Sequence, residues 1–220
     1  MVENKLAQKK TNIFIEKIFQ SYYKNSAKKF PIIPSLTNRE FAFLYFDFPG
    51  MHRHLSFPNK TELLKHLINR VPRHCYRSAS YYNHPIKDSM KDKDYFGCDF
   101  VVDIDSDHIP TPCIEDHNSI LCNNTECKFS CNGNNKPKEC PECGGTKFRE
   151  IAWICHDCLE VTKIQVMNLL DNFLIQEFGL DYQEIKIYFS GHRGYHVQLE
   201  LDDFKTLDSD ARREITDYVT

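Results

Sequence analysis

Eight of the ten cysteines in this 220-residue chain fall between Cys113 and Cys158. This clustering constrains the fold, because so many neighbouring thiols must either pair as disulfides or bind metal. Disulfide frameworks are typical of short secreted chains that carry a signal peptide, and the N-terminal sequence MVENKLAQKK lacks the apolar core of such a peptide. We therefore expect a cytoplasmic protein in which metal orders the cysteine-rich segment.

The thiols and imidazole of this segment suffice for two tetrahedral zinc sites, but the sequence does not dictate how they pair. In one arrangement, the two C-x₂-C pairs at 140–143 and 155–158 share a single ion. We prefer a nested arrangement in which the first site takes the ends of the segment: Cys113, His117, Cys155 and Cys158. The second site then takes four of five cysteines: Cys122, Cys127, Cys131, Cys140 and Cys143. The expected role is structural, and a redox role for C-x₂-C is the minor alternative.

The hydrophobic spacing of the remaining chain predicts both helices and strands. We expect helices from near Thr11 and at 60–70, 160–178 and 209–219, and strands at 40–47, 53–57, 75–82, 97–105, 184–190 and 195–201. This mixture of hairpins and helices predicts an α+β fold. Two adjacent stripes on the first helix are expected in the core: Phe14, Ile18 and Tyr22, with Ile15, Phe19 and Tyr23 beside them. Cys75 and Cys98 are expected to be buried thiols.

Charge is distributed unevenly along the chain. Residues 1–73 carry thirteen Lys and Arg against five Asp and Glu, and the remaining residues carry fifteen against twenty-six. This asymmetry fits a protein that contacts a polyanion with one part and binds cations with another, although two ordinary solvated surfaces would give the same pattern. No apolar run approaches the roughly 20 residues of a membrane span, so we expect no membrane association.

Two aspartates end the predicted strand at 97–105. Alternate residues of a strand share a face, so Asp103 and Asp105 project side by side. Paired carboxylates repel unless a cation lies between them, and hard oxygen ligands favour Mg²⁺ or Mn²⁺. Such a pair is common in two-metal phosphoryl-transfer sites, although a bare D-x-D is also common without function. Asp107 continues the alternation, but we expect it beyond the strand.

The sequence SGHRGYH at 190–196 forms a glycine-flanked turn between two predicted strands. It offers a hydroxyl from Ser190, imidazoles from His192 and His196, and the permanent cation of Arg193. Together these groups would suit a triphosphate, and the alternative is a surface turn with chance histidines.

The order of these motifs resembles the archaeal/eukaryotic-type DNA primase small (catalytic) subunit. The resemblance lies in DFVVDIDSDHIP, the cysteine-rich insert, a long helix ending in EFGL, and IYFSGHRGYHVQL, with NREFAF and HRHLSF upstream. It covers roughly residues 10–220. It implies a mixed-sheet catalytic core made of 1–105 and 159–220, with helices packed on the sheet, and a zinc-binding insert at 106–158.

The resemblance also implies roles for individual residues. Asp103 and Asp105 would be catalytic ligands of Mg²⁺ or Mn²⁺, and Glu40 would be an acidic position of less certain role. Contacts to the phosphates of the incoming nucleotide would come from Ser190, His192, Arg193, His196 and the basic strand position Arg53. His192 stands where many members have Arg, which would weaken triphosphate binding. Cys113, His117, Cys155 and Cys158 would form the zinc-bearing knuckle.

The activity implied is the synthesis of short RNA primers on a single-stranded DNA template from nucleoside triphosphates, with the primase large subunit as partner. The family carries a third metal-binding aspartate beyond the point that corresponds to Thr220, so we expect a missing C-terminal segment or second chain to be needed. Two other functions remain open at this stage. They are a metal-dependent nuclease or phosphatase that uses the aspartates, and a non-catalytic zinc-ribbon module that binds nucleic acid.

Overall fold

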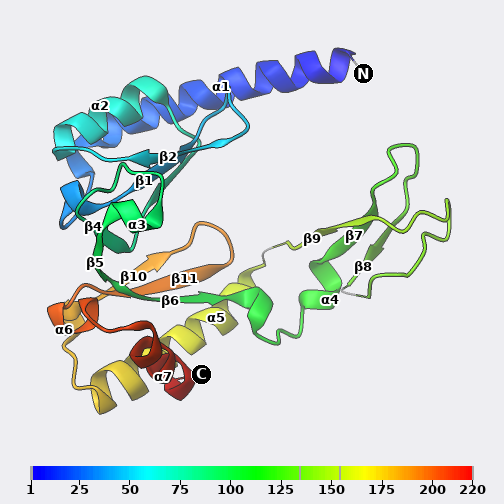
Figure 1. Ribbon diagram of the computed structural model, residues 1–220. Coiled ribbons are helices and arrows are strands. Elements are labelled where there is room, and N and C mark those ends of the chain that lie inside the picture. Colours follow the sequence, from blue (N-terminus) through cyan, green and yellow to red (C-terminus); the bar gives the residue numbers. More distant parts are fainter. Residues whose placement is uncertain (1, 134, 154, 220) are drawn as a thin grey trace. The chain divides into compact units, whose positions relative to one another are not determined.

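The computed structural model describes residues 2–133, 135–153 and 155–219 (Figure 1). The chain divides into two compact units, each built from two stretches of sequence. Unit 1 comprises Met1–Asp99 and Asp202–Leu207, and unit 2 comprises Phe100–Leu201 and Asp208–Thr220. No helix among the described residues is both long and apolar enough to cross a membrane.

Unit 1 contains two small antiparallel sheets. The first has the strand order β2-β1-β3, and the second pairs β4 with β5. The strands are β1 (Phe41–Leu44), β2 (Met51–Leu55), β3 (His74–Arg77), β4 (Ser80–Tyr82) and β5 (Tyr95–Cys98). The helices are α1 (Val2–Ser26), η1 (Ala27–Lys29), η2 (Leu36–Asn38), α2 (Lys60–Arg70), α3 (Met90–Lys93) and α6 (Asp202–Lys205).

The core of unit 1 is aromatic, because β1 directs Phe41 and Phe43 onto the buried face of α2. The side chain of Asn59 caps α2 by accepting a hydrogen bond from the Glu62 N–H at 3.0 Å, which fixes where this helix begins. Leu63 and Leu67 follow one turn apart on the inner face and are almost fully buried.

Of the two stripes expected in the core on the first helix, one is exposed. Phe14, Ile18 and Tyr22 are 65%, 52% and 64% exposed, and α1 begins well before Thr11. The neighbouring stripe turns inward instead: Tyr23 packs against the aromatic core, and its hydroxyl donates a hydrogen bond to the carbonyl of residue 72 at 2.7 Å. Both stripes are aromatic, so composition alone did not separate them.

Two buried ion pairs tie the sheets of unit 1 together. Arg39 and Asp99 are both fully buried and lie 2.7 Å apart, and Tyr81 hydrogen-bonds to both of them. Lys93, also fully buried, pairs with Glu40. Because burying a charge is costly unless it is paired, each of these side chains depends on its partner.

Unit 2 is built around an antiparallel sheet with the order β10-β11-β6. A second sheet, with the order β8-β7-β9, forms a ribbon in the cysteine-rich segment. The strands are β6 (Phe100–Asp105), β7 (Ser119–Cys122), β8 (Ser130–Asn132), β9 (Phe148–Ile151), β10 (Ile185–Phe189) and β11 (Gly194–Leu199). The helices are η3 (Ser106–His108), α4 (Ile114–His117), α5 (His156–Asn168), η4 (Leu169–Glu177), η5 (Tyr182–Glu184) and α7 (Ser209–Val219).

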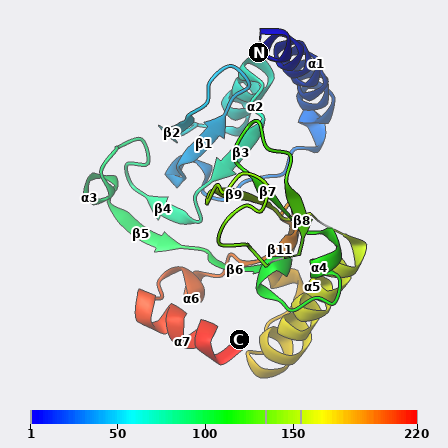
Figure 2. The same cartoon turned by 90° about the vertical axis from the view of Figure 1, so that its right-hand side faces the viewer.

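Helix α5 lies along one face of the main sheet and contacts both β6 and β11 (Figures 1 and 2). That face is apolar: Val197 and Leu199 of β11 are buried there with Phe100 of β6. Strand alternation then turns Asp103 and Asp105 to the opposite face. The packing of α5 therefore decides which side of the sheet carries the acidic pair.

The α+β fold predicted from the sequence is confirmed, but several strands differ. The segments expected as single strands at 75–82 and 97–105 each divide between two sheets, and the second one breaks at the buried Asp99. Cys75 is exposed and Cys98 is half-buried, so the expectation of buried thiols was wrong. The cysteine-rich segment contains a three-stranded sheet that its composition did not predict.

Candidate active site and metal centres

The acidic pair lies opposite the hairpin turn of the main sheet. Antiparallel pairing places Asp103 across from His196 and Asp105 across from Gly194. The Nε2 atom of His196 lies 3.3 Å from an Asp103 carboxylate oxygen. The side chain of Asp103 is 61% exposed and that of Asp105 is 27% exposed, so both carboxylates remain accessible. Their arrangement suits a divalent cation with oxygen ligands.

Asp103 and Asp105 also border a groove within unit 2. The groove continues along α5 and η4 and ends at α7, where Tyr218 lines it. Polar side chains of Gln165 and Asn168 face it from α5. Val102 and Ile104, which alternate with the two aspartates, line the groove as well, so it follows the outer edge of β6.

The turn after β10 is closed by Ser190. Its hydroxyl oxygen accepts hydrogen bonds from the N–H groups of His192 at 3.3 Å and Gly194 at 3.1 Å. Gly191 adopts a φ of 82°, a conformation that favours glycine. Gly194 is required for a different reason, because a Cβ there would lie 2.2 Å from a carboxylate oxygen of Asp105. The turn and the acidic strand are therefore in close contact.

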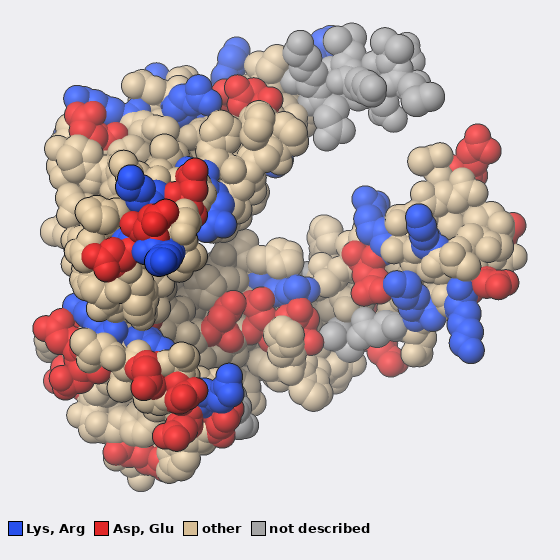
Figure 3. Space-filling view, viewed as in Figure 1, with Lys and Arg blue, Asp and Glu red and all other residues tan. Residues whose placement is uncertain are grey.

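Arg193 is the basic group of this turn, and two acidic residues already face it. Its Nη2 atom lies 2.8 Å from an Asp107 oxygen, and its Nε atom lies 3.9 Å from an Asp105 oxygen. The backbone N–H of Ser106 donates to the Arg193 carbonyl at 3.1 Å. As expected, Asp107 lies beyond the strand, in η3. Figure 3 shows acidic and basic side chains next to one another along β6.

Arg53, the remaining residue expected near the nucleotide, belongs to unit 1. Its side chain is 54% exposed, and its Nε atom lies 3.4 Å from a Glu40 oxygen. Burial raises the pKa of Glu40, but the Lys93 ammonium and the His54 N–H outweigh this effect and hold it below its usual range. Glu40 therefore carries a charge that orients both Lys93 and Arg53.

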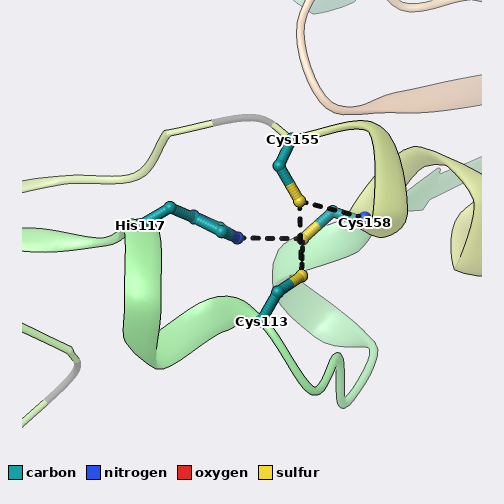
Figure 4. Close-up of side chains that lie close together, drawn as sticks. All are labelled: Cys113, His117, Cys155 and Cys158. Atoms are coloured by element: carbon teal, nitrogen blue, oxygen red, sulfur yellow. Dashed lines mark hydrogen bonds between the residues drawn. The ribbon is translucent and has the colours of Figure 1, made fainter.

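Four possible metal ligands converge at the base of the ribbon: Cys113, His117, Cys155 and Cys158. Figure 4 shows their side chains pointing toward one another, with Cys113 Sγ 3.3 Å from Cys155 Sγ and His117 Nε2 3.2 Å from Cys158 Sγ. The Cys158 N–H donates to Cys155 Sγ at 3.3 Å where α5 begins, so the helix start presents both thiols. This is the Cys₃His inventory of a structural zinc site.

A second group of four thiols lies at the end of the ribbon: Cys122, Cys127, Cys140 and Cys143. The Sγ atoms of Cys122 and Cys143 lie 3.6 Å apart, as do those of Cys127 and Cys140. Cys131, the fifth candidate, lies on β8 outside this group. The two groups within the described residues follow the nested arrangement, in which one cluster lies inside the other along the chain.

The thiols of the clusters affect one another's ionisation. A hydrogen bond from the Gly145 N–H, together with one to Cys122, lowers the pKa of Cys143 to about 7. In the other cluster, hydrogen bonding to Cys155 and burial raise the pKa of Cys113 to about 12. Neighbouring thiols cannot all ionise at once, because the thiolates repel one another unless a cation lies between them. A bound metal ion supplies that cation, so metal binding and thiol deprotonation occur together.

Sequence reasoning missed several residues that support these sites. The Oδ1 atom of Asn118 lies 3.1 Å from Nδ1 of His117 and can accept its hydrogen, and the Thr111 hydroxyl lies 3.4 Å from Cys158 Sγ. Such contacts orient metal ligands. The adjacency of Asn118 to His117 was visible in the sequence, but the pairing of Asp107 with Arg193 crosses between segments far apart in the chain.

Paired carboxylates beside a basic, glycine-flanked turn are typical of metal-dependent phosphoryl and nucleotidyl transfer. A family model described as the DNA primase small subunit matches residues 137–220. The DNA primase small subunit of Methanothrix thermoacetophila is 35% identical over 213 residues, covering 97% of this chain and 44% of that protein.

Two further relatives give the same result. The DNA primase small subunit of Methanosarcina acetivorans is 35% identical over 215 residues, covering 96% of this chain and 42% of that protein. The DNA primase small subunit of Archaeoglobus fulgidus is 33% identical over 213 residues, covering 95% of this chain and 50% of that protein. The chain is therefore homologous to DNA primase small subunits along nearly all of its own length, and it spans about half the length of the curated relatives it matches.

Proposed function

We propose that the chain provides metal- and phosphate-binding residues of a DNA primase catalytic subunit, which makes short RNA primers on single-stranded DNA. The observation that carries this proposal is the pairing of β6 with β11, which joins Asp103 and Asp105 to the SGHRGYH turn. Homology to primase small subunits supports the reaction type. A nuclease would not need the basic turn, and a zinc-ribbon module would not need the paired aspartates.

In the proposed reaction, the 3′-hydroxyl of one nucleotide attacks the α-phosphate of a nucleoside triphosphate, and pyrophosphate leaves. Bound Mg²⁺ or Mn²⁺ would supply charge stabilisation for the attacking and leaving oxygens. Asp103 and Asp105 would hold these ions, and His196 would orient the Asp103 carboxylate. Arg193 and the Ser190 hydroxyl would bind phosphate oxygens, so that the contribution of the chain is positioning and electrostatics.

Residues 106–158 would form a zinc-binding insert in a primase-type core made of 1–105 and 159–220. The two clusters contain the ligand types that Zn²⁺ prefers, and we assign one ion to each. The proposed partners are the single-stranded template, nucleoside triphosphates and the primase large subunit. His192 would add a phosphate contact. The expected compartment is the cytoplasm.

Primer synthesis tests this function. The chain is incubated with the primase large subunit, single-stranded DNA, labelled ribonucleotides and Mn²⁺, and the products are resolved by length. We expect Asp103→Asn or Asp105→Asn to abolish template-dependent addition while the zinc content and circular dichroism spectrum stay unchanged. Because the chain spans half of its relatives, the same substitutions are also made in a full-length relative. Near-normal synthesis by either variant of that relative would refute the assignment.

A further inference from the structure

The arginine that is proposed to bind phosphate is already engaged by an acidic side chain. Arg193 and Asp107 are only 26% and 32% exposed, and their ion pair has a separation of 2.8 Å. Among the described residues, the buried Nε atom of Arg193 has no hydrogen-bond partner, and neither has one buried carboxylate oxygen of Asp105. The guanidinium is therefore held in place chiefly by Asp107, with unused donor capacity remaining.

The backbone fixes this pair in position. The N–H of Ser106 donates to the Arg193 carbonyl at 3.1 Å, which ties η3 to the hairpin turn. Further along, Thr111 contacts the cluster ligand Cys158 at 3.4 Å. Asp107 thus lies on a short segment that is anchored at one end by the main sheet and at the other by the first cysteine cluster, so it cannot move away from Arg193 freely.

We propose that Asp107 is a positioning residue that competes with substrate phosphate for Arg193 and thereby sets the affinity of the site for triphosphate. This inference rests on the proposed function, in which Arg193 contacts phosphate. A carboxylate and a phosphate oxygen use the same N–H donors of a guanidinium. A phosphate group must therefore replace Asp107 or share the guanidinium with it, and after pyrophosphate leaves Asp107 recaptures Arg193.

A role for Asp107 as a further ligand of the catalytic cation predicts the opposite effect. Removing a metal ligand would weaken the binding of Mn²⁺ and of nucleotides that bind with it. Removing a competitor would tighten the binding of phosphate, and it would do so in the absence of Mg²⁺ and Mn²⁺. The sign of the change in nucleotide affinity therefore separates the two roles.

The test measures the binding of ATP and of inorganic tripolyphosphate to the zinc-loaded chain by calorimetry, without and with Mn²⁺. Asp107→Asn should tighten both by roughly two- to fivefold, the range expected for losing a partly exposed ion pair. Arg193→Ala should weaken the binding of both ligands, and the double variant that also carries Asp107→Asn should recover little of the lost affinity. Glu150→Gln is the matched control, because Glu150 lines the same pocket as Asp107 and pairs with Lys136.

Unchanged or weaker binding of ATP and tripolyphosphate by Asp107→Asn would overturn the proposal. An equal gain in affinity from Glu150→Gln would also overturn it, and so would an equal gain from Asp107→Asn when Arg193 is already alanine. If Arg193→Ala binds as tightly as the unmodified chain, the phosphate-binding role of Arg193 fails instead. A second measurement does not depend on nucleotide. The side-chain Nε–H resonance of Arg193 should shift on Asp107→Asn and not on Glu150→Gln, and its failure to shift would show that the ion pair does not form in solution.

Discussion

Replacing Arg39 with alanine should destabilise unit 1 more than any exposed substitution of the same type. The guanidinium makes a 2.7 Å ion pair with Asp99 and donates to the carbonyls of residues 34 and 78 at 2.9 and 2.8 Å. It also donates to the Tyr81 hydroxyl at 2.7 Å and stacks on its ring. Both charged side chains are fully buried, so the substitution leaves a buried carboxylate that has lost its closest cation.

Removing one partner of a buried ion pair costs about 3–5 kcal/mol, because the remaining charge is left desolvated. Arg77, whose NH1 atom lies 3.6 Å from Asp99, lies farther from the carboxylate and offsets only part of this cost. A domain is stable by about 5–15 kcal/mol in total, so the loss would be a large share of the stability of unit 1. At about 4–8 °C per kcal/mol, the melting temperature should fall by roughly 10 °C or more.

Thermal and urea unfolding measure the loss of stability. Hydrogen exchange resolved by peptide should then show faster exchange in segments of unit 1. Arg53→Ala is the control, since Arg53 is in the same unit and also pairs with a carboxylate, but it is 54% exposed. An exposed pair contributes at most about 1 kcal/mol. A cost for Arg39→Ala no greater than that of Arg53→Ala would refute the reasoning.

Three further predictions follow from other parts of the structure. Metal analysis should find two zinc ions per chain, and Cys131→Ser should leave that number unchanged; a single ion would support a shared site instead. Gly194→Ala should cost about 1–3 kcal/mol in unfolding free energy, because its Cβ would meet an Asp105 oxygen at 2.2 Å, and an unaltered urea midpoint would contradict this. The lowered pKa of Glu40 means that its charge stabilises the fold above the ordinary glutamate pKa of about 4.3, and that this contribution is lost as the pH falls through the lower folded value. Without the Lys93 ammonium, burial becomes the main influence on the pKa of Glu40 and raises it, so Lys93→Met should lower the urea midpoint at pH 7 and reduce or reverse its fall between pH 5 and 3.

The sequence predicted elements well where a single face is buried. The last helix spans Ser209–Val219 and the second long helix spans Lys60–Arg70, both as expected, because their apolar residues recur at helical spacing. The first helix was placed too late, and two adjacent aromatic stripes were both expected in the core although only the one with Tyr23 packs there. The strand expected at 97–105 breaks at Asp99, whose partner Arg39 lies sixty residues earlier and could not be found by local reasoning.

In the candidate site, too, features set by neighbouring residues could be predicted from the sequence, and contacts between distant segments could not. The shared face of Asp103 and Asp105 follows from the period of a strand, and the turn at 190–194 follows from its glycines. Residue spacing alone does not reveal that β6 pairs with β11, and this pairing is what brings the carboxylates to the turn. The engagement of Arg193 by Asp107 depends on that pairing, so it too required the structure.

The nesting of the two cysteine clusters has a consequence for how the chain loses conformational freedom. Cys122 and Cys143 are 21 residues apart and lie inside the 42 residues that separate Cys113 from Cys155. The entropy cost of closing a loop grows with the logarithm of its length, so halving the loop saves about 0.6 kcal/mol. When an ion closes the inner cluster, the residues between Cys122 and Cys143 no longer add to the length of the outer loop, and about half of that loop remains as free chain. The inner cluster should therefore fill first and raise the affinity of the outer one by about threefold, a coupling that travels through chain entropy and needs no contact between the ions.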